Sequence, residues 1–370
     1  IVKVDEAKRV VYFLANGKEK DENPYYEHLY RVGLDGSGLQ QVTPGDYFHT
    51  VSMDDNAAFV VNNYSRVNTI PRTDLMDSNG RKLMKLEESD FSGLLAAGYQ
   101  FPEPFKVKAA DGVTDLYGVM YKPFNFDSTA LYPIIDYVYP GPQVEATVYP
   151  FSRMSVRTDR LAQAGFIVIT VGNRGGHPSR SKWYHNFGYG NLRDYGLADQ
   201  KAAIEQLANR YPFIDINRVG IHGHSGGGFM STAAILQYPD FFKAAVSCAG
   251  NHDNRIYNRW WSETHHGVKE VVSEKGDTTF VYNIKTNEEI ASRLKGHLML
   301  VHGDIDNNVH PGNTLRVALI RAGKRFDMLL LPQQRHGFGD MDEYFYWRMV
   351  DYFSRHLLGE QETSVDIPKR

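Results

Sequence analysis

One short run constrains the fold of this chain more than any other feature. Residues 218–229 spell Arg-Val-Gly-Ile-His-Gly-His-Ser-Gly-Gly-Gly-Phe, and a stretch of small residues continues to Gln237, just before Pro239. An apolar strand that ends in Gly-x-Ser-x-Gly and is followed at once by a helix predicts a nucleophile elbow. In such an elbow the turn is so tight that only glycine fits two residues before and two residues after the serine. The elbow exposes the hydroxyl of Ser225 at the carboxyl edge of a sheet. An incidental serine in a glycine-rich turn is the alternative.

The pattern after about residue 100 predicts an α/β sheet, because short apolar strands alternate with helices there. The expected strands are Phe105–Ala109, Leu116–Tyr121, Pro133–Tyr139, Phe166–Val171, Val219–His222, Ala244–Cys248, Leu298–His302 and Phe326–Leu331. The expected helices are Leu192–Asn209, Gly226–Gln237, Asn313–Ala322 and Met341–Leu358. Eight mostly parallel strands with the serine after the fifth strand indicate an α/β-hydrolase fold.

Residues 1–100 have the pattern of a β structure. Strand-like runs occur at Val10–Leu14 and Leu29–Val32, and the outline of Asp5–Phe13 recurs at Asp54–Val61. The offset of roughly 40 to 50 residues is that of one propeller blade. Two such units cannot close a propeller, so we predict a partial β-propeller at 1–100 and a catalytic domain at 101–370. A small antiparallel sheet without any repeat is the alternative for the first segment.

A serine hydroxyl needs a base, and the base needs an acid that orients it and stabilises its charged form. In an α/β-hydrolase the acid follows a late strand and the histidine comes last. His336 lies on a glycine-bounded loop before the final helix, so we predict it as the base among fourteen histidines. Asp304 and Asp306 both follow the strand Leu298–His302, and the pattern alone does not choose between them.

The other histidines are weaker candidates for the catalytic base. We expect His222 to point into or across the sheet, and His224, at the variable position of the elbow, to turn away from the side of attack. His310 lies close to the candidate acid. His265 and His266 lack a third ligand at a metal-binding spacing, so we expect no metal and no cofactor.

An attacked carbonyl becomes an oxyanion and needs two hydrogen-bond donors. The amide of Gly226 is one candidate, since it directly follows the serine. Many esterases take the other donor from a His-Gly-Gly-Gly run after the third strand, and here that place holds Tyr137–Pro142 instead. The phenol of Tyr139 offers a donor. A tyrosine that merely packs in a turn is the alternative.

Composition excludes several classes of partner. Lysine and arginine number 41 against 44 acidic residues, for a net charge of −3, so neither nucleic acid nor an anionic membrane surface is expected as a partner. No apolar run approaches the length of a membrane span. The single cysteine, Cys248, lies in an apolar run and is expected in the core. The chain opens on Ile1 rather than methionine, and we expect it to be a piece of a longer protein.

Several segments after residue 100 together resemble one family. They are Tyr139–Pro142, Asn173–Gly176, Asp199–Gln200, Asp215–Arg218, the elbow, His302–His310 and His336–Gly337. In order and spacing they resemble the prolyl oligopeptidase family of serine peptidases, in particular its dipeptidyl peptidase IV branch. The resemblance implies a hydrolase domain with a propeller cap that cleaves peptides through an acyl-enzyme, as a dipeptidyl-peptidase-like exopeptidase. An esterase or acyl hydrolase on the same fold, or an inactive binding domain, is the alternative.

The resemblance also implies roles for individual residues. It places the acid at Asp306, not Asp304, and supports Tyr139 as an oxyanion donor. The substrate-binding positions that it implies are Tyr257, Trp261, Asn308 and Val309. It further suggests an extracytoplasmic (periplasmic or secreted) location, and assembly as a homodimer is compatible with it.

The chain departs from the family pattern at three positions. Gly226 stands where that branch usually has a tyrosine, and Asn251 and Asn254 stand where the pocket is usually apolar or has a tryptophan. We therefore expect a roomier pocket with one more polar wall, and no strict preference for proline at the cleaved residue.

Overall fold

The computed structural model describes residues 1–139, 144–152, 156–310, 315–360 and 367. The chain forms two compact units. The first consists of Ile1–Pro104 and Val148–Ser155, and the second of Phe105–Thr147 and Val156–Arg370.

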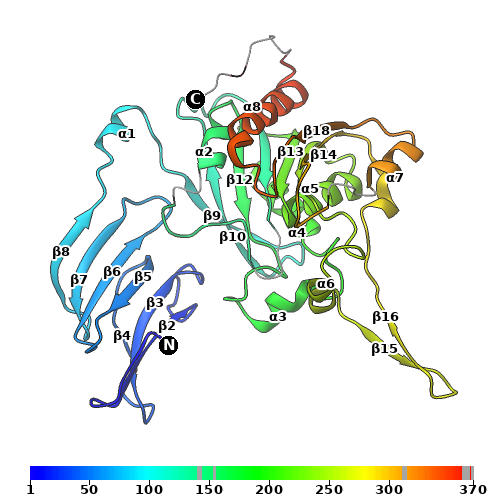
Figure 1. Cartoon of the computed structure of the whole chain (residues 1–370). Coiled ribbons are helices and arrows are strands. Elements are labelled where there is room, and N and C mark those ends of the chain that lie inside the picture. The colour runs from blue at the N-terminus through cyan, green and yellow to red at the C-terminus, as the bar shows by residue number, and fades with distance from the viewer. Residues whose placement is uncertain (140–143, 153–155, 311–314, 361–366, 368–370) are drawn as a thin grey trace. The chain divides into compact units, whose positions relative to one another are not determined.

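The first unit contains two four-stranded antiparallel sheets, shown in blue and cyan in Figure 1. One has the order β1 (Lys3–Asp5), β2 (Val10–Asn16), β3 (Glu27–Gly33) and β4 (Gln40–Gln41), and the other β5 (Phe48–Met53), β6 (Phe59–Ser65), β7 (Arg72–Asp77) and β8 (Lys82–Glu88). Buried residues of both sheets form one apolar cluster, which includes Tyr12, Leu29, Val60 and Met76. Four-stranded antiparallel sheets of this kind are the blades of β-propellers, so the predicted pair of blade-like repeats is confirmed.

A segment distant in sequence completes the first unit. The ring of Tyr149 stacks on that of Tyr25 with centroids 4.2 Å apart, and Phe151 meets Phe91 edge to face at 5.0 Å. The amide of Phe151 also donates a hydrogen bond to Ser65 Oγ. Aromatic packing therefore ties this short segment to the β sheets of the first unit.

The second unit is built on an eight-stranded sheet. Its strands are β9 (Glu103–Lys108), β10 (Asp115–Tyr121), β11 (Tyr132–Tyr137), β12 (Ile167–Val171), β13 (Ile214–His224), β14 (Phe242–Cys248), β17 (His297–Gly303) and β18 (Asp327–Leu331), in the spatial order β18-β17-β14-β13-β11-β12-β10-β9. Pairings from β12 to β18 are parallel, whereas β10 pairs with β12 antiparallel. The predicted α/β-hydrolase fold, with the serine after the fifth strand of this sheet, is confirmed.

Helices cover both faces of this sheet, as Figure 1 shows. Helix α5 (Gly226–Gln237) packs its buried residues against β13 and β14. On the opposite face, Phe353 and Leu357 approach the backbone so closely that a Cβ at Gly220 would lie 2.9 Å from each. Every residue of β12 is buried, as expected for a strand covered on both faces.

The remaining helices connect the strands or lie at the end of the chain. They are α1 (Ser92–Ala96), α2 (Val156–Ala162), α3 (Lys182–His185), η2 (Asn186–Gly188), α4 (Leu197–Arg210), α6 (Arg259–His266), η3 (Glu288–Arg293), α7 (Leu315–Arg321), η4 (Gly339–Met341), α8 (Asp342–Phe353) and the π-helical η5 (Ser354–Leu358). Helix α4 begins five residues later than the expected Leu192. Tight turns through Tyr195 precede it, where the buried Arg193 side chain donates to the carbonyl of Thr286 instead.

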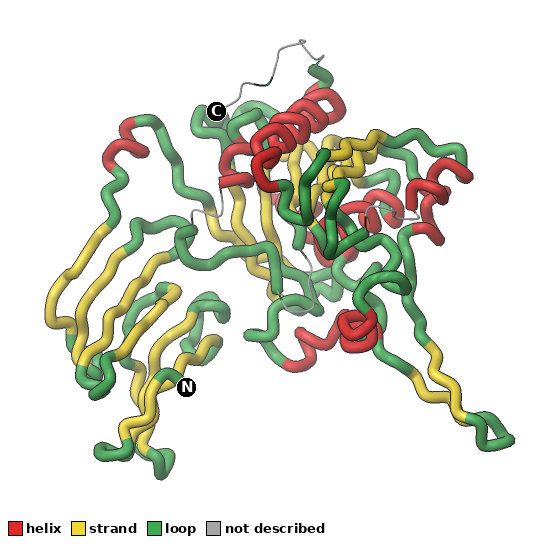
Figure 2. Tube along the Cα trace, viewed as in Figure 1, coloured by secondary structure: helices red, strands yellow, loops and turns green. Residues whose placement is uncertain are grey.

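A β-hairpin of the second unit was not predicted. Strands β15 (Lys269–Val272) and β16 (Thr278–Val281) pair antiparallel, and Figure 2 shows the hairpin extending away from the eight-stranded sheet. All eight strand residues are exposed. Neither strand alternates between buried and exposed side chains, so the sequence had no pattern from which this hairpin could be predicted.

Candidate active site

The turn between β13 and α5 has the backbone geometry of a nucleophile elbow. Ser225 adopts φ 56° and ψ −118°, a conformation that non-glycine residues rarely occupy, and α5 begins at the next residue. The amide of Ser225 donates a hydrogen bond of 2.7 Å to the carbonyl of Cys248 at the end of β14. Backbone strain of this kind costs about 1–3 kcal/mol and persists where the surrounding structure enforces it, often at functional sites.

A single carbonyl explains the glycine spacing of the motif. A Cβ added at Gly223 would lie 2.3 Å from the carbonyl oxygen of Val138, and one added at Gly227 would lie 2.1 Å from the same oxygen. Both distances are far shorter than any contact a methyl group tolerates. The segment after β11 therefore presses against the elbow on both sides of the serine, and only glycine fits there.

Two loops bring a carboxylate and an imidazole together. Asp306 follows β17 and His336 follows β18, and His336 Nδ1 lies 2.8 Å from Asp306 Oδ2. The amides of Asn308 and Val309 donate to the other carboxylate oxygen at 2.8 and 3.0 Å. Burial raises the pKa of the Asp306 carboxyl, but the hydrogen bonds from His336 and from these amides outweigh burial, and the pKa is lowered overall. Asp306 therefore remains charged beside the imidazole, whereas the exposed Asp304 makes no such contact within the described residues.

The side chain of His224 contradicts our expectation for it. Instead of turning away, its ring meets the ring of His336 with centroids 4.8 Å apart and an interplanar angle of 70°, and it also contacts Phe338. The elbow and the His336 loop are thus in direct contact one residue before Ser225. His222, as expected, is buried in the sheet, where it packs between Tyr137 and Phe353.

The hydroxyl of Ser225 makes no hydrogen bond to His336 within the part of the chain that the structure describes. In structures without substrate such bonds are often long and tighten only when substrate binds. The ring contact of His224 places the imidazole at the same edge of the sheet as the serine.

A second imidazole that the sequence did not single out touches the same carboxylate. Nε2 of the buried His302 lies 3.3 Å from Asp306 Oδ2 and donates to the carbonyl of Val309 at 2.8 Å. Burial is the main cause that lowers the pKa of His302, so the ring is neutral and supplies an N–H without adding positive charge. The only feature of the sequence that could have pointed to His302 is its place at the end of β17, four residues before Asp306.

The residues predicted to bind substrate lie in one chain of contacts. The hydroxyl of Tyr257 donates to Asn308 Oδ1 at 3.1 Å, and its ring meets that of Trp261 edge to face at 5.4 Å. Val309 is buried, and its amide binds Asp306. The segment that leads into α6 and the loop that carries Asp306 are thus joined by direct contacts.

The two predicted oxyanion donors flank the elbow. Tyr139 follows β11, and its Cα lies 3.5 Å from the position that a Cβ on Gly227 would take. Burial, and next the electrostatic influence of Tyr139, raise the pKa of Tyr257. Gly226 is the first residue of α5, where an amide has no acceptor within the helix. Pro140–Pro142, the rest of the predicted loop, lie outside the described residues.

The described residues hold no cluster of three or more His, Cys, Asp or Glu side chains suited to a metal ion. None of the helices described is both long and apolar enough to cross a membrane. Cys248, as expected, is buried.

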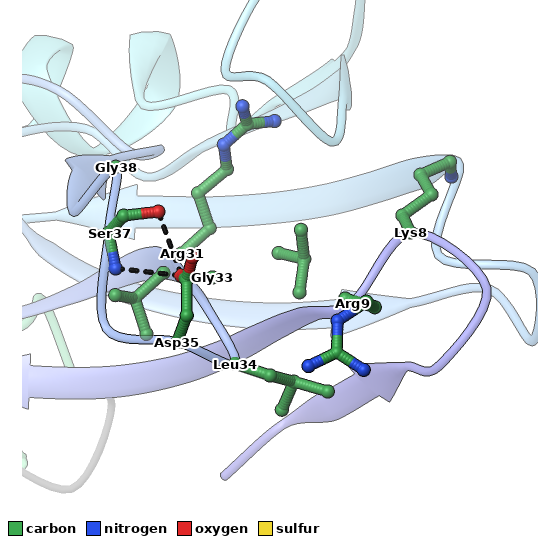
Figure 3. Close-up of a pocket in the computed structure, with 10 residues that line it drawn as sticks. Lys8, Arg9, Arg31, Gly33, Leu34, Asp35, Ser37 and Gly38 are labelled. Atoms are coloured by element: carbon green, nitrogen blue, oxygen red, sulfur yellow. Dashed lines mark hydrogen bonds between the residues drawn. The ribbon is translucent and has the colours of Figure 1, made fainter.

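Cavities occur in both units. One of about 340 Å³ lies in the first unit, and Figure 3 shows the residues that line it, among them Arg9, Arg31 and Leu34. The carboxylate of Asp35 at its edge is already bound by the amide and hydroxyl of Ser37. In the second unit a cavity of about 490 Å³ adjoins His185, Tyr189 and His265. Neither cavity is lined by Ser225, Asp306 or His336.

An elbow serine after the fifth strand of a mostly parallel sheet, next to a carboxylate–imidazole pair from two later loops, defines this unit as a member of the α/β-hydrolase class. Residues 152–360 match the family model of the prolyl oligopeptidase family, and residues 1–71 match that of the dipeptidyl peptidase IV N-terminal region. The chain belongs to the prolyl oligopeptidase family, and the resemblance stated from the sequence is confirmed.

Individual relatives agree with this assignment. Dipeptidyl peptidase 8 of Homo sapiens is 30% identical over 369 residues, which cover 96% of this chain and 40% of that protein. The crystal structure of dipeptidyl peptidase 4 of Porphyromonas gingivalis is similar with a TM-score of 0.81 and 25% identity, over 96% of this chain and 49% of that one. The chain thus spans less than half the length of the relatives it matches.

Proposed function

We propose that this chain carries the catalytic part of a serine peptidase that hydrolyses peptide bonds through an acyl-enzyme. Ser225 attacks the carbonyl carbon of the substrate. His336 accepts the proton of the hydroxyl and later delivers it to the leaving amine, while Asp306 orients the ring and stabilises its charged form. The phenol of Tyr139 and the amide of Gly226 donate hydrogen bonds to the oxyanion.

The observation that carries the proposal is the hydrogen bond of 2.8 Å between Asp306 and His336. The imidazole of His336 also contacts the ring of His224, which belongs to the elbow. A carboxylate bonded to Nδ1 leaves Nε2 as the nitrogen that can act on a hydroxyl. An incidental serine in a turn would need neither the strained backbone of Ser225 nor this pair.

A dipeptidyl-peptidase-like exopeptidase is the form of this activity that the relatives favour. Relatives that match over nearly the whole chain are named dipeptidyl peptidases or dipeptidyl-aminopeptidases, and residues 1–71 match the N-terminal region of dipeptidyl peptidase IV. Comparison of a dipeptide anilide that has a free amino end with its acetylated counterpart tests this form. Equal turnover of both substrates would instead indicate internal cleavage.

A fluorophosphonate probe tests the nucleophile. We expect it to label the 370-residue chain, and the Ser225→Ala variant to lose the label. The Ser273→Ala variant, changed in the exposed hairpin turn, is the matched control and should keep it. Equal labelling of wild type and Ser225→Ala, or labelling of neither, would refute the role of Ser225.

Two further assays separate the alternatives. An esterase on this fold would turn over p-nitrophenyl esters but not peptide anilides, and an inactive binding domain would turn over neither. Size-exclusion chromatography with light scattering tests the homodimer, which stays a prediction. The expected extracytoplasmic location gains no support from the relatives.

A further inference from the structure

A small cavity with polar walls lies in the second unit beside His302, whose Nε2 is 3.3 Å from Asp306 Oδ2. Its volume is about 20 Å³, and one water molecule needs roughly 10–15 Å³ of such space. The strand register places Ser247 of β14 and His302 of β17 on the same face of the sheet, where both line the cavity. The buried imidazole of His252, in the segment after β14, lines it as well. Polar side chains from separate segments thus surround a space of the size of one water molecule.

Hydrogen bonds fix which nitrogen of His252 carries the proton. Asn287 Nδ2 lies 3.0 Å from the carbonyl oxygen of Phe229 and 3.0 Å from His252 Nδ1. A carbonyl only accepts, so the group of Asn287 beside Phe229 must be the amino group, which then also donates to His252 Nδ1. Burial, and next the proximity of His302, lower the pKa of His252 to about 3, so the ring is neutral. Its one proton therefore lies on Nε2.

This Nε2–H group faces the cavity, and it has no close acceptor in the described part of the chain. Ser247 Oγ is 3.5 Å away, longer than the about 2.7–3.2 Å usual for such a bond. The hydroxyl of Ser247 donates to the carbonyl of Gly228 at 2.7 Å, so its lone pairs remain available to accept. The same Nε2 lies over Gly250, because a Cβ there would be 2.8 Å from it. Ser247 and Gly250 both line the cavity, so His252 directs a donor into it.

The imidazole of His302 offers the opposite group. Its Nε2 lies 2.8 Å from the carbonyl of Val309, which only accepts, so Nε2 carries the proton. The ring is neutral, as described above, and Nδ1 is therefore an acceptor. The charged or titratable groups that act on His302 are Asp306 on the loop after β17, His336 on the loop after β18 and Arg316 in α7.

We propose that one water molecule in this cavity links the two imidazoles, and that His252 is thereby a positioning residue for Asp306. The water accepts from His252 Nε2, donates to His302 Nδ1 and directs its second hydrogen at Ser247 Oγ. A buried water typically has two to four such partners. Polarised in this way, the His302 ring presents a stronger Nε2–H dipole to the carboxylate of Asp306. The proposal rests on the function proposed above, in which Asp306 is the acid.

A dry cavity would not explain these walls. Cavities that hold no water in folded proteins are lined by apolar side chains, whereas this one is bordered by a donor and two acceptors. A buried N–H without an acceptor is unfavourable, and a water removes that penalty for His252. The neutral imidazoles also give an ion no reason to be preferred over water.

A crystal structure of the 370-residue chain that resolves ordered water tests the site directly. We expect one water within hydrogen-bond distance of both His252 Nε2 and His302 Nδ1, and its loss in His252→Leu. A cavity without water, or a direct contact between the two ring nitrogens, would overturn the inference. This measurement needs no activity, so it decides the water site even if the proposed function is wrong.

The pH profile of kcat/KM on a peptide anilide tests the positioning role. In His252→Leu the acid limb should move up by roughly half a pH unit, because a less polarised His302 leaves the Asp306 carboxylate to hold the protonated His336 more tightly. His252→Gln, whose amide still donates into the cavity, should keep the wild-type limb. In a His302→Leu background, His252→Leu should add no further shift, since the link passes through His302.

The matched control is His49→Leu, which removes a buried histidine of the first unit and should leave the profile unchanged. Circular dichroism shows whether each variant is folded. An unmoved limb in folded His252→Leu, or a shift that adds fully to that of His302→Leu, would overturn the positioning role. If His252→Leu does not fold, a limb in His252→Gln that moves as far as that of His302→Leu would overturn it instead. Wild-type protein that neither cleaves peptides nor reacts with a fluorophosphonate would overturn the proposed function, and the positioning role with it.

Discussion

The carboxyl group of Asp136 should control how the stability of the second unit depends on pH. Asp136 lies in β11 at the centre of the sheet, is 0% exposed, and neither of its carboxylate oxygens has a hydrogen-bond partner in the described part of the chain. Burial raises the pKa of Asp136 well above the ordinary value of 3.8. The folded protein therefore retains this proton at pH values where an unfolded chain releases it.

The size of the effect follows from proton linkage. Between pH 3.8 and the raised pKa, the unfolded state binds fewer protons than the folded state, so stability falls as the pH rises. The loss is about 1.4 kcal/mol for each pH unit. Asparagine at position 136 has a similar shape but cannot ionise, so its own desolvation penalty does not vary with pH. The free energy of unfolding of Asp136→Asn, minus that of wild type, should therefore rise by about 1.4 kcal/mol per pH unit until the raised pKa is reached.

Urea unfolding at pH 5, 6 and 7 measures this difference. Tryptophan fluorescence reports on the second unit alone, because all four tryptophans lie there, namely Trp183, Trp260, Trp261 and Trp347. Asp240→Asn is the control. Asp240 is exposed, and its interaction with Lys295 lowers its pKa, so it is charged throughout this pH range and should show a constant difference. Parallel stability curves for Asp136→Asn and wild type would show that Asp136 is not held protonated, and would refute the reasoning.

Two further predictions concern the elbow and Asp306, the proposed acid. Gly227→Ala would place a methyl group 2.1 Å from the carbonyl of Val138, so the serine must move, and fluorophosphonate labelling should slow by about a hundredfold; labelling at the wild-type rate would contradict this. His302→Leu removes an imidazole whose Nε2–H is donated to the carbonyl of Val309 and lies 3.3 Å from Asp306 Oδ2, so the carboxylate loses a nearby dipole and should attract the protonated His336 ring more strongly. The acid limb of the pH profile of kcat/KM should move to higher pH, while His302→Gln, whose amide still donates, should restore it; an unchanged limb in His302→Leu would count against a positioning role.

The elbow and the sheet could be predicted from the sequence because both leave local traces. The carbonyl of Val138 presses on both sides of Ser225, so glycine is required at fixed spacing, and that spacing is visible in the chain. A strand buried on both faces, such as β12, appears as a continuous apolar run. All eight strands of the sheet were expected, and only the start of β13, five residues before the expected Val219, lies more than two residues from its predicted place. Helix α5 was predicted with its correct ends because it starts at the elbow and stops before Pro239.

Contacts between loops leave no such trace. The position of His224 against His336 depends on how the loop after β18 folds over the elbow, and the pattern near Ser225 contains no information about that loop. The same holds for His302, whose Nε2 comes within 3.3 Å of Asp306 only because the loop after β17 curls back on its own strand. The side chains that surround the proposed catalytic groups are therefore the part of the site that only the structure reveals.

Asn251 and Asn254 show how the two sources of information combine. The sequence marked both positions only as departures from a family pattern, which predicted a more polar wall. The structure shows that the two amides bond to each other, so the pair leaves one donor and one acceptor rather than four independent polar atoms. Two asparagines that did not touch would be satisfied by almost any polar side chain or by water. The mutual bond fixes both amide planes, which is a property of the folded chain that the two separate positions in the sequence could not show.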